Sequence, residues 1–567
     1  MTKNCTLKLT GALKKVENRA GIEAVTVIAF FLILNALKIT LFNYYIIPSQ
    51  TEEIFKYKFR MSILLALAIY PLILRIKSRI FFIAVYILQT VYILANISYY
   101  LYYHNYLHIL QWFTLFDEGF TAVKSFAAPI SFKLLVVLVD FPAFIYIAIN
   151  FYRIYNARKK RGLYRLLIVI TSISMIASIE LNNYNAGSSI IQFVNDRYKG
   201  ESLITERYGT AVNEVTSLLL KGNEKQMISS FEYGKALINE KAAEDKPNFI
   251  IIQVESMDAN VANQKYDGDY IAPYLHSLTE QAVYYPYAMS YHKGGSTSDA
   301  EFSTINSLEP LDGFPALKLS NYSYPNSMLY RLVSSSYKTV AFHGNLGSFF
   351  NRDTAFPKMG FEEFYDMLKM GMKDVGWGAP DQDVFNFAAK TIKTLEQPYL
   401  SYIITMTSHG PFTNARNYYN NSRYDDIKDE TVRNYFNSIS YVDQSIKNFV
   451  TDIKASCKNT YIFIYGDHTP DIDTSDYKQA SFTVDNRYFE FVPLFIITPD
   501  NKHYKEDKKV ASFLDISPTI LYSAGIPFEI KSDGQDLLDT AGKTSNPIPF
   551  KGGKYDRTYL FDEIKKK

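Results

Sequence analysis

The sequence predicts a protein of two parts, an α-helical membrane domain followed by an α/β domain that faces outward. Three observations lead to this fold class. The first 181 residues contain five long apolar segments. Loops rich in lysine and arginine alternate with loops that are not. After Pro247, short and nearly continuous apolar runs alternate with helical stretches, which indicates a mostly parallel sheet covered on both faces.

The apolar segments are long enough, or nearly so, to cross a bilayer, which requires about 20 residues each. They lie at residues 22–47, 61–76, 80–101, 133–152 and 163–181. We therefore expect a transmembrane domain of five helices at 1–181. The polar stretch 182–245 has helical spacing over 202–221 and is interpreted as a helical linker, which leaves 246–567 for the α/β domain.

The distribution of basic residues sets the orientation. Lysines and arginines gather before the first segment, between the second and third, and between the fourth and fifth. The loops 48–60 and 104–131 are mixed or acidic. The positive-inside rule then places the N-terminus in the cytoplasm and everything after residue 181 outside. This predicts a multi-pass protein of a bacterial cell membrane with an extracellular α/β domain.

Two charged residues lie inside predicted spans. Lys38 is late in an outward-running helix and Asp140 is early in an inward-running one. At 1.5 Å per residue, both fall roughly 10 Å below the outer surface. Charges at this depth are costly and usually paired or functional, so one hypothesis is that Lys38 and Asp140 face each other. The alternative is that Lys38 extends to the interface and Asp140 faces a wet crevice.

Composition excludes several classes of protein. The net charge of +3 gives no reason to expect nucleic-acid binding. The two cysteines, Cys5 and Cys457, lie in different halves of the chain. We therefore expect neither a disulfide framework nor a cysteine zinc site. A large outer domain without disulfides fits a bacterial surface.

Four apolar runs of the α/β domain end in an acid or a histidine. In open α/β sheets, ligands bind beyond the carboxyl ends of the strands, so we expect these side chains to form a site. The runs are FIIIQVE, KTVAFH, YIITMTSH and TYIFIYGDH, and they deliver Glu255, His343, His409, and Asp467 with His468. A fifth run, EFVPLFIITPD, ends in Asp500.

The stretch GGSTSDAEFSTINSL, residues 294–308, predicts the start of a helix. Ser298 followed three residues later by Glu301 has the pattern of a capping box. The adjacent Thr297 hydroxyl is a candidate nucleophile, because a helix N-terminus places positive potential beneath a phosphate. The two glycines would let the backbone approach that phosphate closely.

Glu255, Asp467, His468 and the Thr297 hydroxyl form a mixed set of oxygen and nitrogen donors. Such a set suits a divalent cation such as manganese, magnesium or zinc. A metal in contact with Thr297 would stabilise its alkoxide and so create a nucleophile.

A second group of residues could bind the anionic oxygens of a phosphate. His343, Arg352 and His409 would stabilise the charge that accumulates in the transition state. Phe349 and Phe350 could wall the pocket or could be ordinary packing residues. The residues alone thus predict a metal-dependent transferase or hydrolase of phosphate esters that works through a phosphothreonine-type intermediate. A site facing outward beside a membrane suggests a lipid substrate.

The motifs VES, GGSTSDAEF, FHGN…FFNRD, TSHGPF and YGDH, placed after five spans, resemble the lipoteichoic acid synthase family. Members of this family are polyglycerol-phosphate transferases of the sulfatase-like alkaline phosphatase superfamily. The resemblance covers nearly the whole chain. It implies phosphatidylglycerol as donor, a bound manganese ion, a glycolipid or growing polyglycerol-phosphate chain as acceptor, and release of diacylglycerol. It also implies a place in lipoteichoic acid biosynthesis in a Gram-positive cell wall.

The resemblance also implies roles residue by residue. Thr297 would be the nucleophile. The implied metal ligands are Glu255, Thr297, Asp467 and His468. The implied phosphate or glycerol ligands are His343, Arg352 and His409. Near the glycerol pocket the chain departs from the main synthase at Asn345, Phe350 and Thr469–Asp471, so primase-like transfer or transfer to another glycan stays open.

Other functions compete with this interpretation. A phosphoethanolamine transferase or lipid phosphodiesterase would use the same nucleophile, although phosphoethanolamine transferases usually carry several outer disulfides. A true sulfatase needs a C/S-x-P-x-R motif, and none surrounds Thr297. A catalytically inactive surface protein is the alternative outside enzymes.

Overall fold

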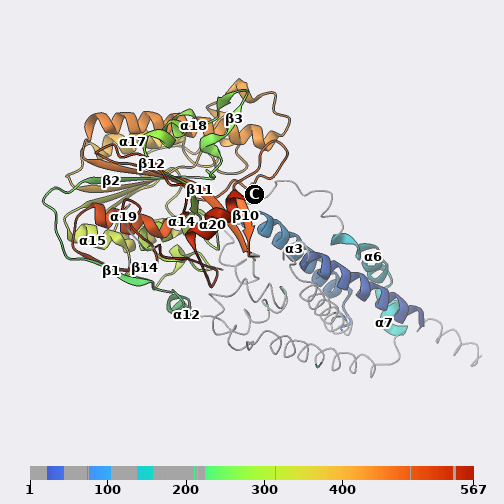
Figure 1. Cartoon of the computed structure of the whole chain (residues 1–567). Helices are drawn as coiled ribbons and strands as arrows, with labels where there is room; N and C mark the ends of the chain where they lie inside the picture. The colour runs from blue at the N-terminus through green and yellow to red at the C-terminus, as the bar shows by residue number, and fades with distance from the viewer. Residues whose placement is uncertain are drawn as a thin grey trace, which may run out of the picture. The chain divides into compact units, whose positions relative to one another are not determined.

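A computed structural model of the chain describes residues 22–43, 70, 73, 76–103, 137–157, 173, 210, 214, 224–312, 314–485, 487–539 and 545–566 (Figure 1). The chain divides into two compact units. One comprises residues 1–119 and 126–221, and the other comprises residues 120–125 and 222–567. The predicted helical spacing at 202–221 lies outside the described residues, apart from two positions.

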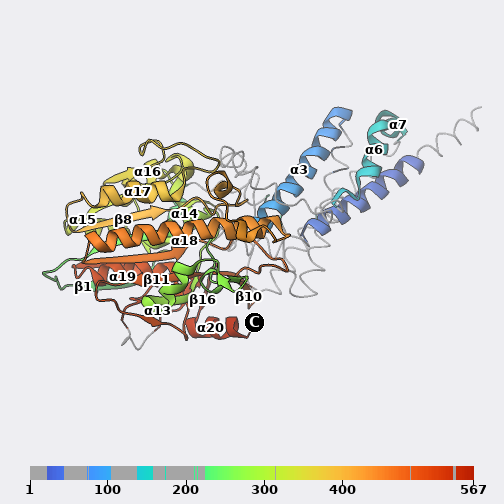
Figure 2. The same ribbon diagram turned by 90° about the horizontal axis from the view of Figure 1, so that it is seen from above.

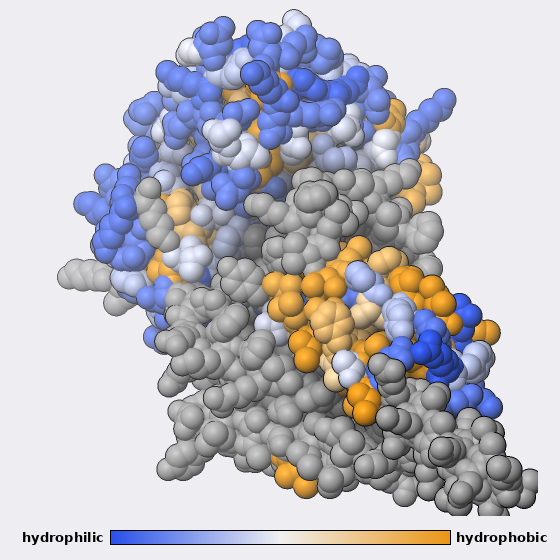
Figure 3. Space-filling model, turned by 90° about the vertical axis from the view of Figure 1, so that its right-hand side faces the viewer, coloured by the Kyte–Doolittle hydropathy of each residue, from blue (hydrophilic) through white to orange (hydrophobic). Residues whose placement is uncertain are grey.

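Two helices of the first unit are long and apolar enough to cross a membrane, judged by length and composition. They are Ile22–Asn43 and Arg79–Ile97, the latter within α3 (Arg79–Tyr103). Both coincide with predicted spans. Hydrophobic side chains gather on the described helices of this unit (Figure 3). The first unit therefore presents the apolar surface expected of a membrane domain.

The count of five spanning helices is not confirmed. The predicted span 133–152 is interrupted, because a turn at Asn150 separates α6 (Phe141–Ile149) from α7 (Phe151–Ala157). Asparagine favours helix ends over interiors, and the Asn150 amide closes α6 by donating to the Tyr146 carbonyl. The predicted spans 61–76 and 163–181 lie almost wholly outside the described residues.

Lys38 and Asp140 face each other inside the first unit, as one of the two sequence hypotheses predicted. The Lys38 Nζ lies 3.3 Å from the Asp140 Oδ1, and both side chains are fully buried. Tyr86 and Asn35 also donate to the Asp140 carboxylate, at 2.7 and 2.8 Å, and Lys38 donates to Thr90 at 2.7 Å. These bonds join the helix Ile22–Asn43, α3 and the residue that precedes α6, so the buried charges are paired and hydrogen-bonded.

The second unit is built on a mostly parallel sheet. Its main path runs β12, β5, β11, β9, β2, β8, β6, β7. The bounds of these strands, in chain order, are β2 Asn248–Val254, β5 Val283–Met289, β6 Lys338–His343, β7 Glu363–Tyr365, β8 Tyr399–Ile404, β9 Thr460–Gly466, β11 Arg487–Ile497 and β12 Tyr504–Lys505. Strands β9, β2, β8 and β6 are parallel neighbours, whereas β11 runs antiparallel to both β9 and β5. The predicted sheet is thus confirmed, with one central strand reversed.

Helices cover both faces of this sheet (Figure 1). On one face lie α13 (Pro273–Gln281), α17 (Asp381–Ile392) and α18 (Glu430–Ser456). On the other lie α14 (Thr297–Asn306), α15 (Met328–Ser334) and α19 (Ile516–Ser523). Because side chains alternate along a strand, Phe249 and Ile251 pack into one core while Ile250 and Ile252 pack into the other. Burial on both faces explains why the strand sequences are continuously apolar.

Two further features frame this unit. The long helix α18 lies beside α17, and their Phe449 and Phe385 rings are 5.0 Å apart (Figure 2). Within the stretch interpreted as a linker, residues Lys235–Asn239 form strand β1, which pairs antiparallel with β14 (Phe528–Ser532). The second unit therefore begins upstream of the first predicted strand.

Candidate active site and metal centre

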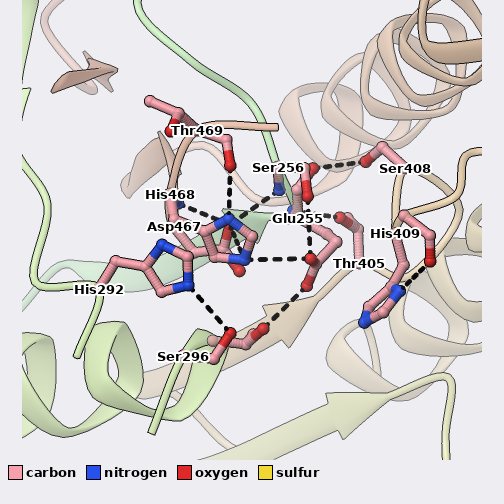
Figure 4. Close-up of polar contacts among 12 residues, drawn as sticks. Glu255, Ser256, His292, Ser296, Thr405, Ser408, His409, Asp467, His468 and Thr469 are labelled. Atoms are coloured by element: carbon pink, nitrogen blue, oxygen red, sulfur yellow. Dashed lines mark hydrogen bonds and ion pairs between the residues drawn. The ribbon is translucent and has the colours of Figure 1, made fainter. Parts of the chain in front are cut away.

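The four strand ends singled out in the sequence converge at one edge of the sheet. Glu255 directly follows β2, and Asp467 and His468 directly follow β9. His343 is the last residue of β6, and His409 follows the bend after β8. Because these strands are parallel neighbours, their carboxyl ends lie side by side. Figure 4 shows the Glu255, Asp467 and His468 side chains pointing toward one another.

Glu255, Asp467 and His468 form a buried cluster with the spacing of a metal site. One ligand atom from each lies within 4.8 Å of the others. The His468 Nε2 is 3.2 Å from the Glu255 Oε1 and 3.7 Å from the Asp467 Oδ1. The Thr297 hydroxyl donates to the Glu255 Oε2 at 3.0 Å. The structure therefore brings all four predicted metal ligands together.

The unsatisfied atoms of this cluster fit a divalent cation. The His468 Nδ1 donates to the Thr469 carbonyl at 2.8 Å, which leaves Nε2 facing the cluster. The Asp467 Oδ1 accepts from the amides of Ser256 and His468, both at 2.8 Å. Among the described residues, the buried Asp467 Oδ2 makes no hydrogen bond, and the His468 Nε2 has only its contacts with the Glu255 and Asp467 carboxylates. Oxygen and imidazole donors aimed at one point suit manganese, magnesium or zinc.

The charges of the cluster also favour a cation. Burial raises the pKa of Asp467 well above its usual value, and the neighbouring Glu255 adds to the rise. Burial alone would lower the pKa of His468, but Asp467 and Glu255 outweigh it and raise that pKa to about 10. Burial would raise the pKa of Glu255, yet His409 and His468 hold it below its usual range. Two carboxylates in this interior thus require a positive partner, either a proton or a cation.

Thr297 is the first residue of α14, a helix whose ten residues are all buried. Ser296 precedes it with φ 50° and ψ −127°, and Ser256 follows Glu255 with φ 52°. Such backbone conformations cost a non-glycine residue about 1–3 kcal/mol and are typical of functional sites. A Cβ on Gly295 would lie 2.3 Å from the Asp299 Oδ1, so this glycine makes room for a neighbouring carboxylate.

The predicted capping box is absent. The Ser298 hydroxyl donates to the Gly295 carbonyl at 2.6 Å. The side chain of Ser296, the N-cap residue, makes no capping hydrogen bond to the helix amides. Glu301 turns instead to Arg352, which lies in a distant segment of the sequence. A tertiary ion pair has replaced the local pattern, because Arg352 is buried and needs a carboxylate partner.

Arg352, at the start of α16 (Arg352–Met359), is held tightly. Its Nε is 3.1 and 3.0 Å from the two Glu301 oxygens, and its Nη2 is 2.5 Å from Oε1. Its Nη1 lies 3.2 Å from the His343 Nε2. Burial and the adjacent guanidinium lower the pKa of His343 well below its usual value, so that imidazole is neutral and accepts from Arg352. Phosphate binding by these two residues stays a prediction.

Aromatic rings connect the remaining predicted substrate-binding residues. Phe350 stacks its ring 5.5 Å from the Arg352 guanidinium, and Phe349 lies 4.9 Å from Phe350. Trp377 lies 6.3 Å from Phe349 and 4.4 Å from the His409 ring. These rings form a wall between His409 and Arg352, in which Phe350 is buried and Phe349 and Trp377 are half-buried. Asn345, the other predicted residue, is half-buried, and its own Oδ1 accepts from the Leu346 amide at 2.7 Å.

The structure adds residues that sequence reasoning did not find. His292 stacks on His468, and Glu490 accepts hydrogen bonds from both His292 and Thr469. Glu490 lies near the beginning of β11. The sequence contained a signal, because Glu490 and His292 each adjoin an apolar run. Only the knowledge that β11 is antiparallel would place the start of the run that begins at Glu490 beside the site.

Comparisons with known proteins agree with this architecture. The model of the Sulfatase family matches residues 247–526. Lipoteichoic acid synthase 2 of Bacillus subtilis is 29% identical over 323 residues, which are 54% of this chain and 49% of that protein. Lipoteichoic acid synthase of Staphylococcus aureus is 29% identical over 330 residues, or 55% of this chain and 50% of that protein. The chain thus spans about half the length of the curated relatives it matches.

Among solved structures, the lipoteichoic acid synthase LtaP of Listeria monocytogenes matches 56% of this chain and 82% of its own, with 26% identity and a TM-score of 0.49. The family model coincides with the described sheet, helices and ligand cluster. Residues 247–526 are therefore a sulfatase-family domain, and over this region the chain is similar to lipoteichoic acid synthases.

Proposed function

We propose that the protein is a membrane-bound phosphoglycerol transferase. It would move glycerol phosphate from phosphatidylglycerol to a glycolipid or a growing lipoteichoic acid chain and release diacylglycerol. The observation that carries this proposal is the position of Thr297. This residue begins a buried helix, and its hydroxyl donates to Glu255 in a cluster that fits a cation. The curated relatives named lipoteichoic acid synthase support the class of substrate.

Glu255, Thr297, Asp467 and His468 would hold the metal, with manganese as the expected ion. When bound, the cation would act as a Lewis acid that stabilises the threonine alkoxide and the phosphoryl charge. The His468 tautomer set by the Thr469 carbonyl presents Nε2 to that position.

The transfer has two halves, both carried by Thr297. In the first, Oγ1 forms a bond to phosphorus while the bond between phosphorus and the diacylglycerol oxygen breaks. The threonine proton is released as the metal stabilises the alkoxide, and a proton ends on the diacylglycerol hydroxyl. In the second, an acceptor hydroxyl attacks the phosphothreonine, and its proton returns to Oγ1. Splitting one displacement into two in this way is the usual gain from a covalent intermediate.

Arg352, His343 and His409 would stabilise the phosphoryl oxygens. Glu301 fixes the orientation of the Arg352 guanidinium before the substrate arrives. The guanidinium therefore does not have to reorient during the reaction. The wall formed by Phe350, Phe349 and Trp377 would exclude water beside the glycerol unit. An extracellular active site in a chain that also carries a multi-pass membrane anchor would have access to lipid donors.

The test is a donor assay on the full chain in vesicles that contain manganese. Phosphatidylglycerol and phosphatidylethanolamine, each labelled in the acyl chains, are supplied separately, with and without a glycolipid acceptor. We expect diacylglycerol from phosphatidylglycerol, loss of that release in Thr297→Ala, and retention in Thr391→Ala, a threonine of α17. Release of diacylglycerol only from phosphatidylethanolamine would show that phosphatidylglycerol is not the donor. Release at the same rate with and without the glycolipid acceptor would indicate a phosphodiesterase.

A further inference from the structure

A buried carboxylate on the antiparallel strand lies behind the metal-ligand cluster. Glu490, on β11, accepts from the Thr469 amide at 2.9 Å and from the Thr469 hydroxyl at 2.7 Å. The His292 Nδ1 lies 3.0 Å from its other oxygen. Glu490 is only 5% exposed, so these partners replace the water that an ionised carboxylate needs.

Both partners of Glu490 act on the same metal ligand. The Thr469 carbonyl accepts from the His468 Nδ1 at 2.8 Å and so fixes which nitrogen faces the cluster. The His292 ring stacks on the His468 ring, with centroids 4.4 Å apart and planes 17° apart. The position of His468 therefore depends on one carboxylate through a hydrogen bond on one side and a ring contact on the other.

The same imidazole also reaches the nucleophile loop. The Ser296 hydroxyl lies 3.4 Å from the His292 Nε2, and Ser296 directly precedes Thr297 (Figure 4). His292 follows β5, whose neighbour β11 carries Glu490, and the Ser290 amide donates to the Glu490 carbonyl at 3.0 Å. Residues 292–297 thus connect the carboxylate on β11 with the start of α14.

We propose that Glu490 and His292 are positioning residues, which together hold the ligand His468 and the nucleophile Thr297 in register for one cation. The inference rests on the proposed metal-dependent transfer. Groups that orient metal ligands from behind set affinity strongly, because a ligand held in place loses less freedom when the metal binds. Without Glu490, the Thr469 carbonyl and the His292 ring would lose their common anchor.

The test measures Mn²⁺ binding to the full chain in detergent by calorimetry, with no lipid substrate present. Glu490→Gln keeps the shape of the side chain but removes its charge. His292→Phe keeps the ring contact but removes both nitrogen contacts. We expect each variant to bind Mn²⁺ about 10–100-fold more weakly than the unchanged protein.

Two controls calibrate the measurement. Asp467→Asn removes a predicted ligand and should abolish binding. Asp443→Asn removes another buried carboxylate, one that accepts from the Tyr274 and Leu275 amides at the start of α13. It should leave Mn²⁺ affinity unchanged even if it lowers thermal stability, so a general loss of stability is separated from a loss of positioning.

A double-mutant cycle completes the test. Residues that act through one network give losses that do not add, so the double variant should bind Mn²⁺ only slightly more weakly than the worse single variant. Unchanged affinity in His292→Phe and Glu490→Gln, or fully additive losses, would overturn the inference. Should Glu490→Gln fail to fold, His292→Phe alone decides between the outcomes. The calorimetry contains no lipid, so its outcome does not depend on the donor assay. Failure to turn over phosphatidylglycerol would refute the proposed function but would not change the measured Mn²⁺ affinities.

Discussion

The pairing of Glu301 with Arg352 makes a sharp prediction, because local sequence and tertiary structure assign Glu301 different roles. The two side chains are at most 1% exposed, and three short contacts join them. Removing one member of such a buried ion pair costs about 3–5 kcal/mol, since it leaves the other charge buried without a partner. The Gln amide of Glu301→Gln can still accept one bond, so we expect the lower end, about 3 kcal/mol.

The assay is urea unfolding of the full chain in detergent, with Ser298→Ala as the matched control. Ser298 donates one hydrogen bond, to the Gly295 carbonyl, so its loss should cost only about 1 kcal/mol. Replacing the whole pair, with Glu301→Leu and Arg352→Met together, should cost less than Glu301→Gln alone. A capping box would instead make Glu301→Gln and Ser298→Ala equally mild, about 1 kcal/mol each, and that result would refute the reasoning.

Three further predictions concern stability. Lys38→Asp and Asp140→Lys should each cost about 3–5 kcal/mol in thermal or urea unfolding, and the double swap should recover most of it; no recovery would contradict the pairing. Burial raises the pKa of Asp443 from 3.8 to about 6. The folded protein therefore binds the proton of the Asp443 carboxyl group more tightly than the unfolded chain does. The free energy of unfolding should fall by about 3 kcal/mol as the pH rises from about 4 to about 7. The variant Asp443→Asn should show no such fall when unfolding is measured across this pH range. A Cβ at Gly466 would lie 1.8 Å from the Met257 carbonyl oxygen, so Gly466→Ala should destabilise by about 3 kcal/mol or more in the same assay.

The main features of the α/β domain could be predicted because they depend on short-range patterns. Continuous apolar runs identify strands buried on both faces, and parallel neighbours bring their carboxyl ends to one edge. Glu255, Asp467 and His468 follow from that rule without any knowledge of distant contacts. The equal depth of Lys38 and Asp140 in their helices made their pairing one of two hypotheses, and the structure decides for it.

The rest depended on contacts that a single sequence does not display. The run ending in Asp500 belongs to the antiparallel β11, so Asp500 lies at the far edge and the beginning of the run brings Glu490 to the site. Strand direction is set by connectivity and neighbours, not by the apolar pattern. Glu301 fits a capping box locally, but a buried guanidinium outweighs a helix amide as its partner. The interruption at Asn150 is a different case, because the preference of asparagine for helix ends is visible in the sequence.

The central claim, that Thr297 is the nucleophile of a phosphoglycerol transfer, can be tested by trapping the covalent intermediate. The full chain in vesicles of phosphatidylglycerol is quenched with acid in the absence of acceptor, digested and analysed by mass spectrometry. The proposed function predicts glycerol phosphate on the peptide that contains Thr297, located on Thr297 by fragmentation, with an equal amount of diacylglycerol released. Adduct on Ser296 or Ser298, or diacylglycerol released with no adduct at early times, would contradict it.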